Sequence, residues 1–459
     1  MGTKRSSGEL GRRAMVMGAM WVALSLPALA RAKGSVELPL AEPMPAVHRA
    51  ERWSLHGQMT FVEQARPALR SPYAGPNSLQ AAAEVALSYT ATIFAALRPW
   101  QGATLIFNPE VSGGEGLSST HGLGGFANGE IYRVGSRSPR FNLSRLLLQQ
   151  IWSLGAEPVW LPAAANQLGA ASSARRLTLV AGKFSLSDYL DSNAYAHDPR
   201  SQFLNWALMD AGAYDYAADT RGYTWGVYGD YSDRTWSLRM AAVLEPAVAN
   251  GLALDLNLAR AHSLNVELEW RFSLLGQPGE AHLLLFSNHA RMGLYDAALR
   301  SAAGGRPDIT RSRAYRAKRG LAINLEQSLG GAHGLFMRLS LSDGRTESWA
   351  FTEIDQALAL GVQGGGELWG RADDRAGLAL MLHGLAAPHR AYLAHGGLGF
   401  MLGDGGLNYA PEAIIEVYYL IHPLAWLTLT ADLQLVRAPG YNADRGPVAI
   451  AALRLHLEL

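Results

Sequence analysis

The sequence predicts an all-β fold: a transmembrane antiparallel β-barrel of about 16 strands, with long outer loops partly folded into the lumen. Apolar and polar residues alternate along segments of roughly 9–11 residues, and long connections alternate with short ones. Charged residues form only 17% of the chain. A soluble β-sandwich also alternates, but these segments are long and carry Trp and Tyr near their ends, as strands at a membrane interface do.

The N-terminus predicts export. Two adjacent arginines precede a charge-free stretch, Ala14–Ala30, which contains Pro27 and ends in small residues. Residues 1–32 are therefore interpreted as a secretory signal peptide rather than a membrane anchor. Residues 33–51 lack alternation and are expected to form a short periplasmic arm, which leaves residues 52–459 for the barrel.

Alternation is clearest between Leu264 and Leu274, where six apolar residues share one face. The opposite face carries Glu267, Glu269 and Arg271. We interpret these three as part of a polar lumen wall with ion pairs between neighbours, because paired acid–base carboxylates would be unusual there.

Three more amphipathic segments follow Glu412. The first is expected to turn at His422–Pro423, the second to end at the polar loop Arg437–Gly446, and the third to run to Leu459. The polar face of the last segment carries Arg454, His456 and Glu458. Such a strand is suited to close the barrel edge in lipid.

The connections predict which end of the barrel faces outward. The long ones, expected to be outer loops, are Gln64–Ala82, Glu110–Phe141, Ser185–Gly222, Glu245–Ser263, Ala290–Lys318 and Leu385–Ala410. Tight periplasmic turns are expected at Arg98–Gly102, Ser232–Asp233, Gly276–Gly279 and Gly330–Gly334. Two connections that the alternation places on the periplasmic side are long instead of short: Leu154–Arg175 and Gly364–Ala376. The strand boundaries around 141–176 and 352–377 therefore stay open.

Enzyme chemistry finds no support in the sequence, which contains no nucleophile elbow, metalloprotease helix or phosphate-binding loop. No cofactor and no metal site is predicted, and the absence of cysteine excludes thiolate ligands and disulfides. The glycines between Gly113 and Gly125 are expected to form a tightly folded loop. Three histidines without ligand spacing are expected to be polar groups of loops or lumen: His383, His389 and His395.

A basic run lies between Arg300 and Arg319, with Asp308 as its one acidic residue. Nucleic acid is not expected as a partner, since the run contains a single aromatic residue and the net charge of the chain is only +1. Contact with lipopolysaccharide phosphates and simple solvation of an outer loop both remain open. The basic residues inside the run are Arg306, Arg311, Arg313, Arg316 and Lys318.

Lys183–Arg221 has the richest composition, mixing aromatic residues with carboxylates and amides. Inside a water-filled barrel it would narrow the pore, where aromatic rings stack on sugar C–H faces and polar groups bind hydroxyls. The alternative is a loop that caps the barrel and packs on itself.

Four stretches resemble the carbohydrate-selective porins of the bacterial outer membrane: Phe107–Glu130, Ala181–Trp225, Ala394–Asn408 and Ala410–Leu435. The resemblance implies a sixteen-stranded barrel that admits glucose and related sugars by diffusion, through a constriction formed by inward-folded loops. The pore-lining residues that it implies are Glu110, Glu115, Lys183, Asp188, Asp191, Asn193, His197, Arg200, Asn205 and Trp206. The chain departs from the family in ending with Leu459 rather than an aromatic residue, and in lacking an S-layer-type helical domain.

We therefore expect a passive, sugar-preferring outer-membrane porin, in contact with outer-membrane lipid and lipopolysaccharide, as a monomer or a homotrimer. A barrel that exports a cell-made polysaccharide is the main alternative. A barrel-borne enzyme acting on lipid or glycan would need a Ser, His and acid set on the outer face, and the apolar-facing positions carry no such set.

Overall fold

The computed structural model describes residues 42–43, 50–133, 136–164 and 166–459. The predicted signal peptide, residues 1–32, and most of the predicted periplasmic arm, residues 33–51, lie outside the described residues. The barrel strands are β2 (Trp53–Arg66), β3 (Glu84–Leu97), β4 (Ala103–Gly114), β5 (Arg140–Ser153), β8 (Arg176–Phe184), β9 (Thr224–Ser232), β10 (Trp236–Val243), β11 (His262–Leu274), β12 (Gln277–Met292), β13 (Ala314–Gly330), β14 (His333–Ser342), β15 (Gln356–Gly365), β16 (Arg375–Gly384), β17 (Glu412–Leu424), β18 (Leu427–Arg437) and β19 (Val448–Glu458).

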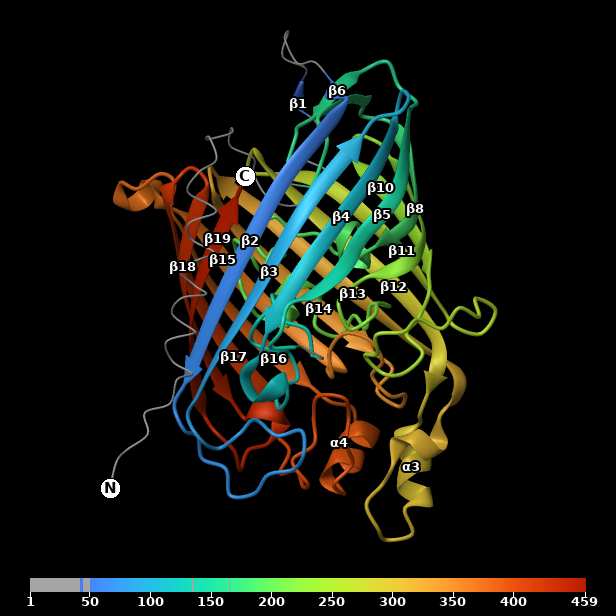
Figure 1. Cartoon of the computed structure of the whole chain (residues 1–459), viewed down its shortest axis with the longest axis vertical. Coiled ribbons are helices and arrows are strands. Elements are labelled where there is room, and N and C mark those ends of the chain that lie inside the picture. The colour runs from blue at the N-terminus through green and yellow to red at the C-terminus, as the bar shows by residue number, and fades with distance from the viewer. Residues whose placement is uncertain (1–41, 44–49, 134–135, 165) are drawn as a thin grey trace, which may run out of the picture.

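These sixteen strands form one closed antiparallel barrel, in which β19 pairs back onto β2 (Figure 1). The predicted fold, its strand number and the closing role of the last strand are confirmed. A separate sheet contains β1 (Glu42–Pro43), β6 (Pro158–Leu161) and β7 (Ala170–Ser173). The described helices are α2 (Trp206–Met209), α3 (Tyr295–Ser301) and α4 (Ala387–Ala394), with 3-10 turns η1 (Leu117–Ser119), η2 (Leu186–Asp188), η3 (Ile309–Ser312), η4 (Gly366–Trp369) and η5 (Pro439–Tyr441).

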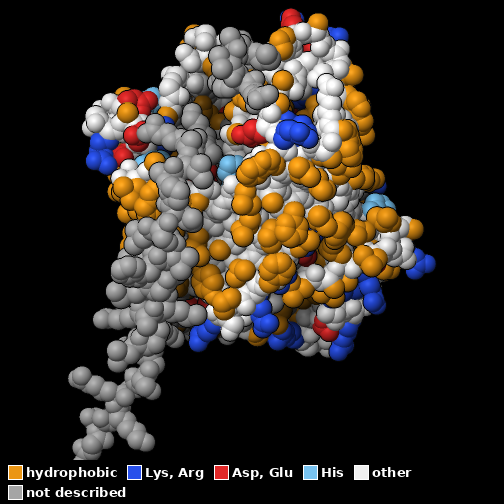
Figure 2. All heavy atoms as spheres, turned by 45° about the horizontal axis from the view of Figure 1, so that its top comes forward, with side chains coloured by type: hydrophobic (Ala, Val, Ile, Leu, Met, Phe, Trp, Pro, Cys, Tyr) orange, Lys and Arg blue, Asp and Glu red, His pale blue; other side chains and the backbone are white. Residues whose placement is uncertain are grey.

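The strand pleat separates an apolar outer face from a polar inner one. On β11, Leu264 is 50% exposed, whereas Glu267 is fully buried. Apolar side chains cover much of the barrel wall in view in Figure 2, and basic residues gather at its lower rim. Such a band is what an outer-membrane barrel presents to lipid. None of the described helices is long and apolar enough to cross a membrane.

Ion pairs on the inner wall follow from the strand register. Arg239 of β10 lies opposite Glu267 of β11 and contacts it at 2.8 Å, whereas Arg271 contacts Glu269, two residues away on the same face of β11, at 2.5 Å. Cross-strand neighbours on one face lie close enough for such pairs. The interpretation of these carboxylates as a paired lumen wall is confirmed.

The two ends of the barrel differ in their connections. Long loops with α3 and α4 occupy one end, while most short turns, β6 and the C-terminus occupy the other (Figure 1). Since short turns of outer-membrane barrels face the periplasm, α3 and α4 mark the extracellular end. The basic run lies at this end in part only, because Lys318 is buried on β13, 3.1 Å from Asp215.

One predicted turn is wrong. Strand β17 continues through His422 and Pro423, and the chain turns at Ala425–Trp426. A register irregularity between Ile421 and Leu424 accommodates the proline, which has no N–H to donate to the ladder.

The two long connections that broke the predicted rule hide no barrel strand. β5 pairs directly with β8, so Leu154–Arg175 is an insert at the periplasmic end that carries β6 and β7. Gly364–Ala376 contains η4 between the ends of β15 and β16. Residues 343–355, which reach into the region whose strand boundaries stayed open, form an outer loop, and this loop completes the alternation of outer and periplasmic connections.

Loops from the extracellular end fill much of the lumen, as predicted. Arg338 of β14 donates to the backbone carbonyls of Ala196 and Leu208 at 2.6 Å and of Asp191 at 2.8 Å, fixing the loop over residues 185–223. The glycine-rich loop is tightly folded: Gly122 has φ of 86°, and a Cβ there would lie 1.9 Å from the backbone nitrogen of Leu79.

Candidate functional site

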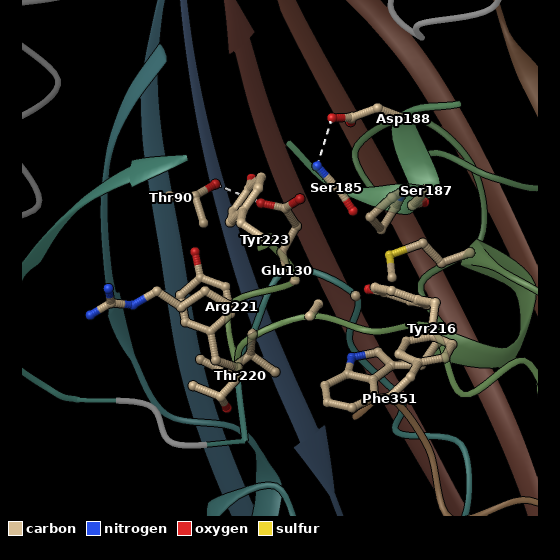
Figure 3. A pocket seen from close by; sticks show the side chains of 18 of the residues that line it. Thr90, Glu130, Ser185, Ser187, Asp188, Tyr216, Thr220, Arg221, Tyr223 and Phe351 are labelled. Carbon is tan, nitrogen blue, oxygen red and sulfur yellow. Dashed lines mark hydrogen bonds between the residues drawn. The ribbon is translucent and has the colours of Figure 1, made fainter. Parts of the chain in front are cut away.

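A narrow cavity of about 210 Å³ lies between the inward loops and the wall near β2 to β5. Figure 3 shows Glu130, Arg221 and Tyr223 on one side, facing Ser187, Tyr216 and Phe351 on the other. We call it the outer cavity. Its walls come from segments that are far apart in sequence, so it exists only when the loops are folded into the lumen.

Arg200 anchors a charged cluster in the outer cavity. Its Nε lies 2.9 Å from Glu130, its Nη1 donates to Gln58 at 2.9 Å, and Glu110 lies 4.0 Å away. Burial lowers the pKa of Arg200, but the two carboxylates raise it by more than burial lowers it, so the guanidinium stays charged. Tyr132 donates its hydroxyl to Glu110, and burial with this carboxylate raises the pKa of the tyrosine.

A second ion pair joins Arg145 of β5 to Asp188 of η2. Arg145 Nε donates to Asp188 at 2.7 Å, its Nη1 donates to Asn108 at 2.8 Å, and its guanidinium lies over the Tyr223 ring at 5.4 Å. The backbone N–H of Ser185 donates to the same aspartate at 3.0 Å. Such bidentate, hydrogen-bonded pairs hold both partners in a fixed geometry.

This pair marks the junction between two spaces. A wider cavity of about 630 Å³, which we call the inner chamber, lies on the periplasmic side. Arg145, Asp188 and Asn166 border both the outer cavity and the inner chamber. The Arg145–Asp188 pair therefore lies at the boundary between the two spaces, and we call this boundary the constriction.

Aromatic rings complete the outer cavity. Trp206 stacks on Phe351 at 5.6 Å between ring centroids, and Tyr216 packs on the same ring at 4.6 Å. Trp206 Nε1 donates to the backbone carbonyl of Asn128, which fixes the orientation of the indole. Lys183 and Asp219, 3.9 Å apart, form a third charge pair beside Tyr223.

Paired charges beside aromatic faces suit an uncharged, polyhydroxylated solute. Arg145, Lys183 and Arg200 each have a carboxylate next to them. The guanidinium of Arg221 donates to the side-chain oxygen of Asn142 at 3.1 Å, and donors and acceptors remain in reach of hydroxyl groups. Aromatic faces contact the apolar C–H surfaces of such a solute. Nothing in this set resembles a catalytic nucleophile beside a general base.

The structure divides the ten candidate pore residues into three groups. Five border the outer cavity: Glu110, Asp188, His197, Arg200 and Trp206. Three hold the inward loop in place and border neither space: Asp191, Asn193 and Asn205. Asn193 binds Asn324 at 2.7 Å, and Asn205 accepts the Ala207 N–H at 3.0 Å.

The last two candidates lie beside the passage rather than in its lining. Lys183 lies behind Tyr223, where it pairs with Asp219. Glu115 pairs with Arg137 at the protein surface, where their side chains are 41% and 75% exposed.

Sequence reasoning missed several lining residues, among them Arg145, Glu130 and Tyr223. Arg145 carried a usable signal, because it interrupts an apolar segment of a predicted strand. A register shift between Asn108 and Pro109 accompanies its inward orientation. Glu130 and Tyr223 carried none, since only the loop packing brings them to the passage.

Comparisons with known proteins agree with this geometry. Residues 79–459 match the family model of the carbohydrate-selective porins, OprB family. The high-pH structure of Pseudomonas putida OprB has a TM-score of 0.65 at 15% identity, covering 89% of this chain and 94% of that one. The low-pH structure of the same porin has a TM-score of 0.46 at 14% identity, over 89% and 93% of the two chains.

The outer-membrane channel DcaP of Acinetobacter baumannii has a TM-score of 0.49 at 10% identity, over 89% of this chain and 97% of that one. No curated protein sequence matches the chain. The family match covers most of the chain, and the barrel, its outer apolar band and its lumen agree with it. The chain belongs to the OprB family of carbohydrate-selective porins of the outer membrane.

Proposed function

We propose that this porin mediates passive, sugar-preferring diffusion of glucose-like monosaccharides and small oligosaccharides across the outer membrane. The observation that carries the proposal is the constriction at Arg145 and Asp188, where a fixed charge pair lies against the face of Tyr223. A paired charge offers hydrogen bonds to a neutral sugar without attracting one sign of ion.

Weak, distributed contacts support diffusion rather than capture. Arg200, Lys183 and Arg145 are each already paired with a carboxylate, so a sugar exchanges with existing contacts instead of satisfying a bare charge. Binding in a channel has to be weak enough for release, and such exchange keeps it so.

The narrow outer cavity argues against the alternative of polysaccharide export. At about 210 Å³, and crossed by the side chains of the inward loop, it leaves little room for a polymer chain. The outer apolar face offers lipid contact rather than a catalytic set, which supports a channel instead of an enzyme.

Liposome swelling tests the proposal. Vesicles that contain the purified porin are diluted into isotonic glucose, maltose, a longer oligosaccharide, or triethylene glycol as a non-sugar solute. We expect glucose to permeate fastest, with rates that fall as the oligosaccharide lengthens. Equal rates for the sugars and for a non-sugar of matched size would refute sugar preference.

A further inference from the structure

One periplasmic connection is a folded insert rather than a short turn. The insert Leu154–Arg175 carries β6 and β7, and β6 pairs with β1, so that Trp160 lies opposite Glu42. The insert buries Trp160, Leu161 and Leu168, whose exposed fractions are 8%, 3% and 5%. In Figure 1 it lies over the periplasmic end of the barrel beside β5 and β8.

The insert is fixed to the barrel rim. The backbone N–H of Gly169 donates to the Glu51 carboxylate at 2.8 Å, and the Glu51 N–H donates to the Gly169 carbonyl at 3.1 Å. Arg98, at the turn after β3, donates to the carbonyl of Glu51 at 2.6 Å and to that of Gly169 at 3.3 Å. These four hydrogen bonds hold the insert against the barrel rim, so it forms an ordered cover over the periplasmic end.

Beneath the cover lies the inner chamber, whose volume of about 630 Å³ falls within the roughly 300–1,000 Å³ typical of small-molecule sites. The insert contributes Leu161, Leu168 and Gln167 to its lining, and the barrel wall contributes Leu147 and Gln149. The lining thus combines aliphatic and aromatic surface with uncharged amides, and its charged residues are Arg98 at the rim under the cover and Arg145 and Asp188 at the junction with the outer cavity.

Two hydroxyl groups in this lining lack protein partners. Tyr228 Oη and Thr178 Oγ1 are buried, and neither has a hydrogen-bond partner among the described residues. A buried hydroxyl without a partner is unfavourable, and a ligand hydroxyl can satisfy it as donor or acceptor. The Tyr228 ring stacks on that of Tyr189 at 4.5 Å, which places an aromatic surface beside both groups.

We propose that the Leu154–Arg175 insert completes a second binding chamber, on the periplasmic side of the constriction, for an uncharged, polyhydroxylated solute of sugar size. The chamber deepens the proposed function and rests on it, since the solute arrives through the Arg145–Asp188 constriction. Tyr228 and Thr178 bind its hydroxyls, while the aliphatic and tyrosine surfaces contact its C–H faces. A solute is then held once in each space during passage.

The test uses glucose-induced current noise of the full chain in planar bilayers. The native porin should show two relaxation components, one for each space. Replacing residues 155–174 by an Asn-Gly turn, which suits a two-residue hairpin, should remove one component and raise the conductance. The Tyr228→Phe and Thr178→Val variants keep the cover and should weaken the same component about two- to tenfold, the range for one hydrogen bond.

Thr430→Val is the matched control. Thr430 also carries a buried hydroxyl without a partner among the described residues, but it borders neither the outer cavity nor the inner chamber. This variant should leave both components unchanged. If the shortened chain fails to fold, the two hydroxyl variants alone decide.

The outcomes separate this proposal from the proposed function. A single component that persists unchanged in the shortened chain and in both hydroxyl variants overturns the inner chamber as a binding site, while sugar passage stands. If glucose produces no noise or block in the native porin, the proposed function fails and the chamber proposal fails with it.

Discussion

The outer cavity and the inner chamber lie on either side of one ion pair, yet they are built differently. The outer cavity is narrow, and its wall carries the ion pairs of Arg145 and Arg200, with the Lys183–Asp219 pair beside it. The inner chamber is about three times larger, by 630 to 210 Å³, and is lined mainly by aliphatic, tyrosine and amide groups.

This difference shows where discrimination between solutes can arise. Preorganised charges act strongly where a solute is stripped of water, which occurs at the narrow outer cavity. The inner chamber can hold a solute without removing all of its water, so its contribution to selectivity is smaller. Changes in the outer cavity should therefore have larger effects than matched changes in the inner chamber.

The largest effect is expected from Arg338→Leu. Three backbone carbonyls of the inward loop would lose their buried donor, and Asp191 its cationic partner. We expect the free energy of unfolding to fall by about 3–5 kcal/mol, and the single-channel conductance to rise severalfold as the outer cavity opens. Arg300→Leu, at an exposed position of α3, should change neither quantity. A native conductance in Arg338→Leu would contradict the role of this anchor.

Neutralising one side of the constriction should change ion selectivity. Arg145→Ala leaves Asp188 unpaired, and a unit charge at 4 Å is worth about 1–4 kcal/mol between water and a protein surface. The K⁺ over Cl⁻ permeability ratio, from reversal potentials in a KCl gradient, should rise at least about fivefold. Asp188→Asn should shift it the opposite way. Thr178→Val, in the inner chamber, should leave the permeability ratio unchanged. If Thr178→Val shifted this ratio as much as Arg145→Ala does, the two spaces would not differ in their effect on ion selectivity.

The stability of the porin should depend on pH through Asp210, a buried residue of the inward loop. Burial raises the pKa of Asp210 to about 6, the Asp191 carboxylate adds to this shift, and His197 and Arg338 oppose it. At this carboxyl group the folded state then binds more protons than the unfolded one, so the contribution of Asp210 to the free energy of unfolding falls as pH rises from about 4 to about 6. Asp210→Asn should be more stable than the native chain at pH 7, by roughly 2–3 kcal/mol, and similar to it at pH 4.

Denaturant unfolding at both pH values checks this expectation, with Asp296→Asn on the exposed part of α3 as the control. A native chain and an Asp210→Asn chain whose stabilities change equally between pH 4 and pH 7 would contradict the assignment of the shift to buried Asp210.

The smallest effect is expected from Glu115→Gln. This residue pairs with Arg137 at the surface, where solvent screens the attraction between the two charges. Conductance, glucose permeation and stability should all stay close to those of the native porin. A clear loss of glucose permeation would show that Glu115 acts in the passage and would contradict its assignment to the protein surface.

The barrel could be predicted from the sequence because each strand carries its own signal. Alternation along Leu264–Leu274 is a property of neighbouring residues, and lipid selects the apolar face without reference to any distant residue. The turn at His422–Pro423 was wrong for the same local reason. Proline favours a turn in isolation, whereas a bulge in the ladder with β18 accommodates it within β17.

The passage could be predicted only in part. Asp188, His197 and Arg200 lie in the segment whose composition pointed to the lumen, and they border the outer cavity. Asp191 and Asn205 lie in the same segment, but their side chains accept backbone N–H groups of the loop, those of Ala211 and Ala207, and hold it. A polar side chain that faces the pore and one that anchors the loop look alike in sequence, because the distant partner decides the role.

Sugar preference at the constriction is tested most directly by comparing glucose and triethylene glycol, at equal osmolarity, as blockers of single-channel current in the native porin and in Arg145→Ala. The account predicts that glucose reduces the native current more than the glycol does, and that Arg145→Ala removes most of this difference. Equal reduction by both solutes in the native porin would contradict it.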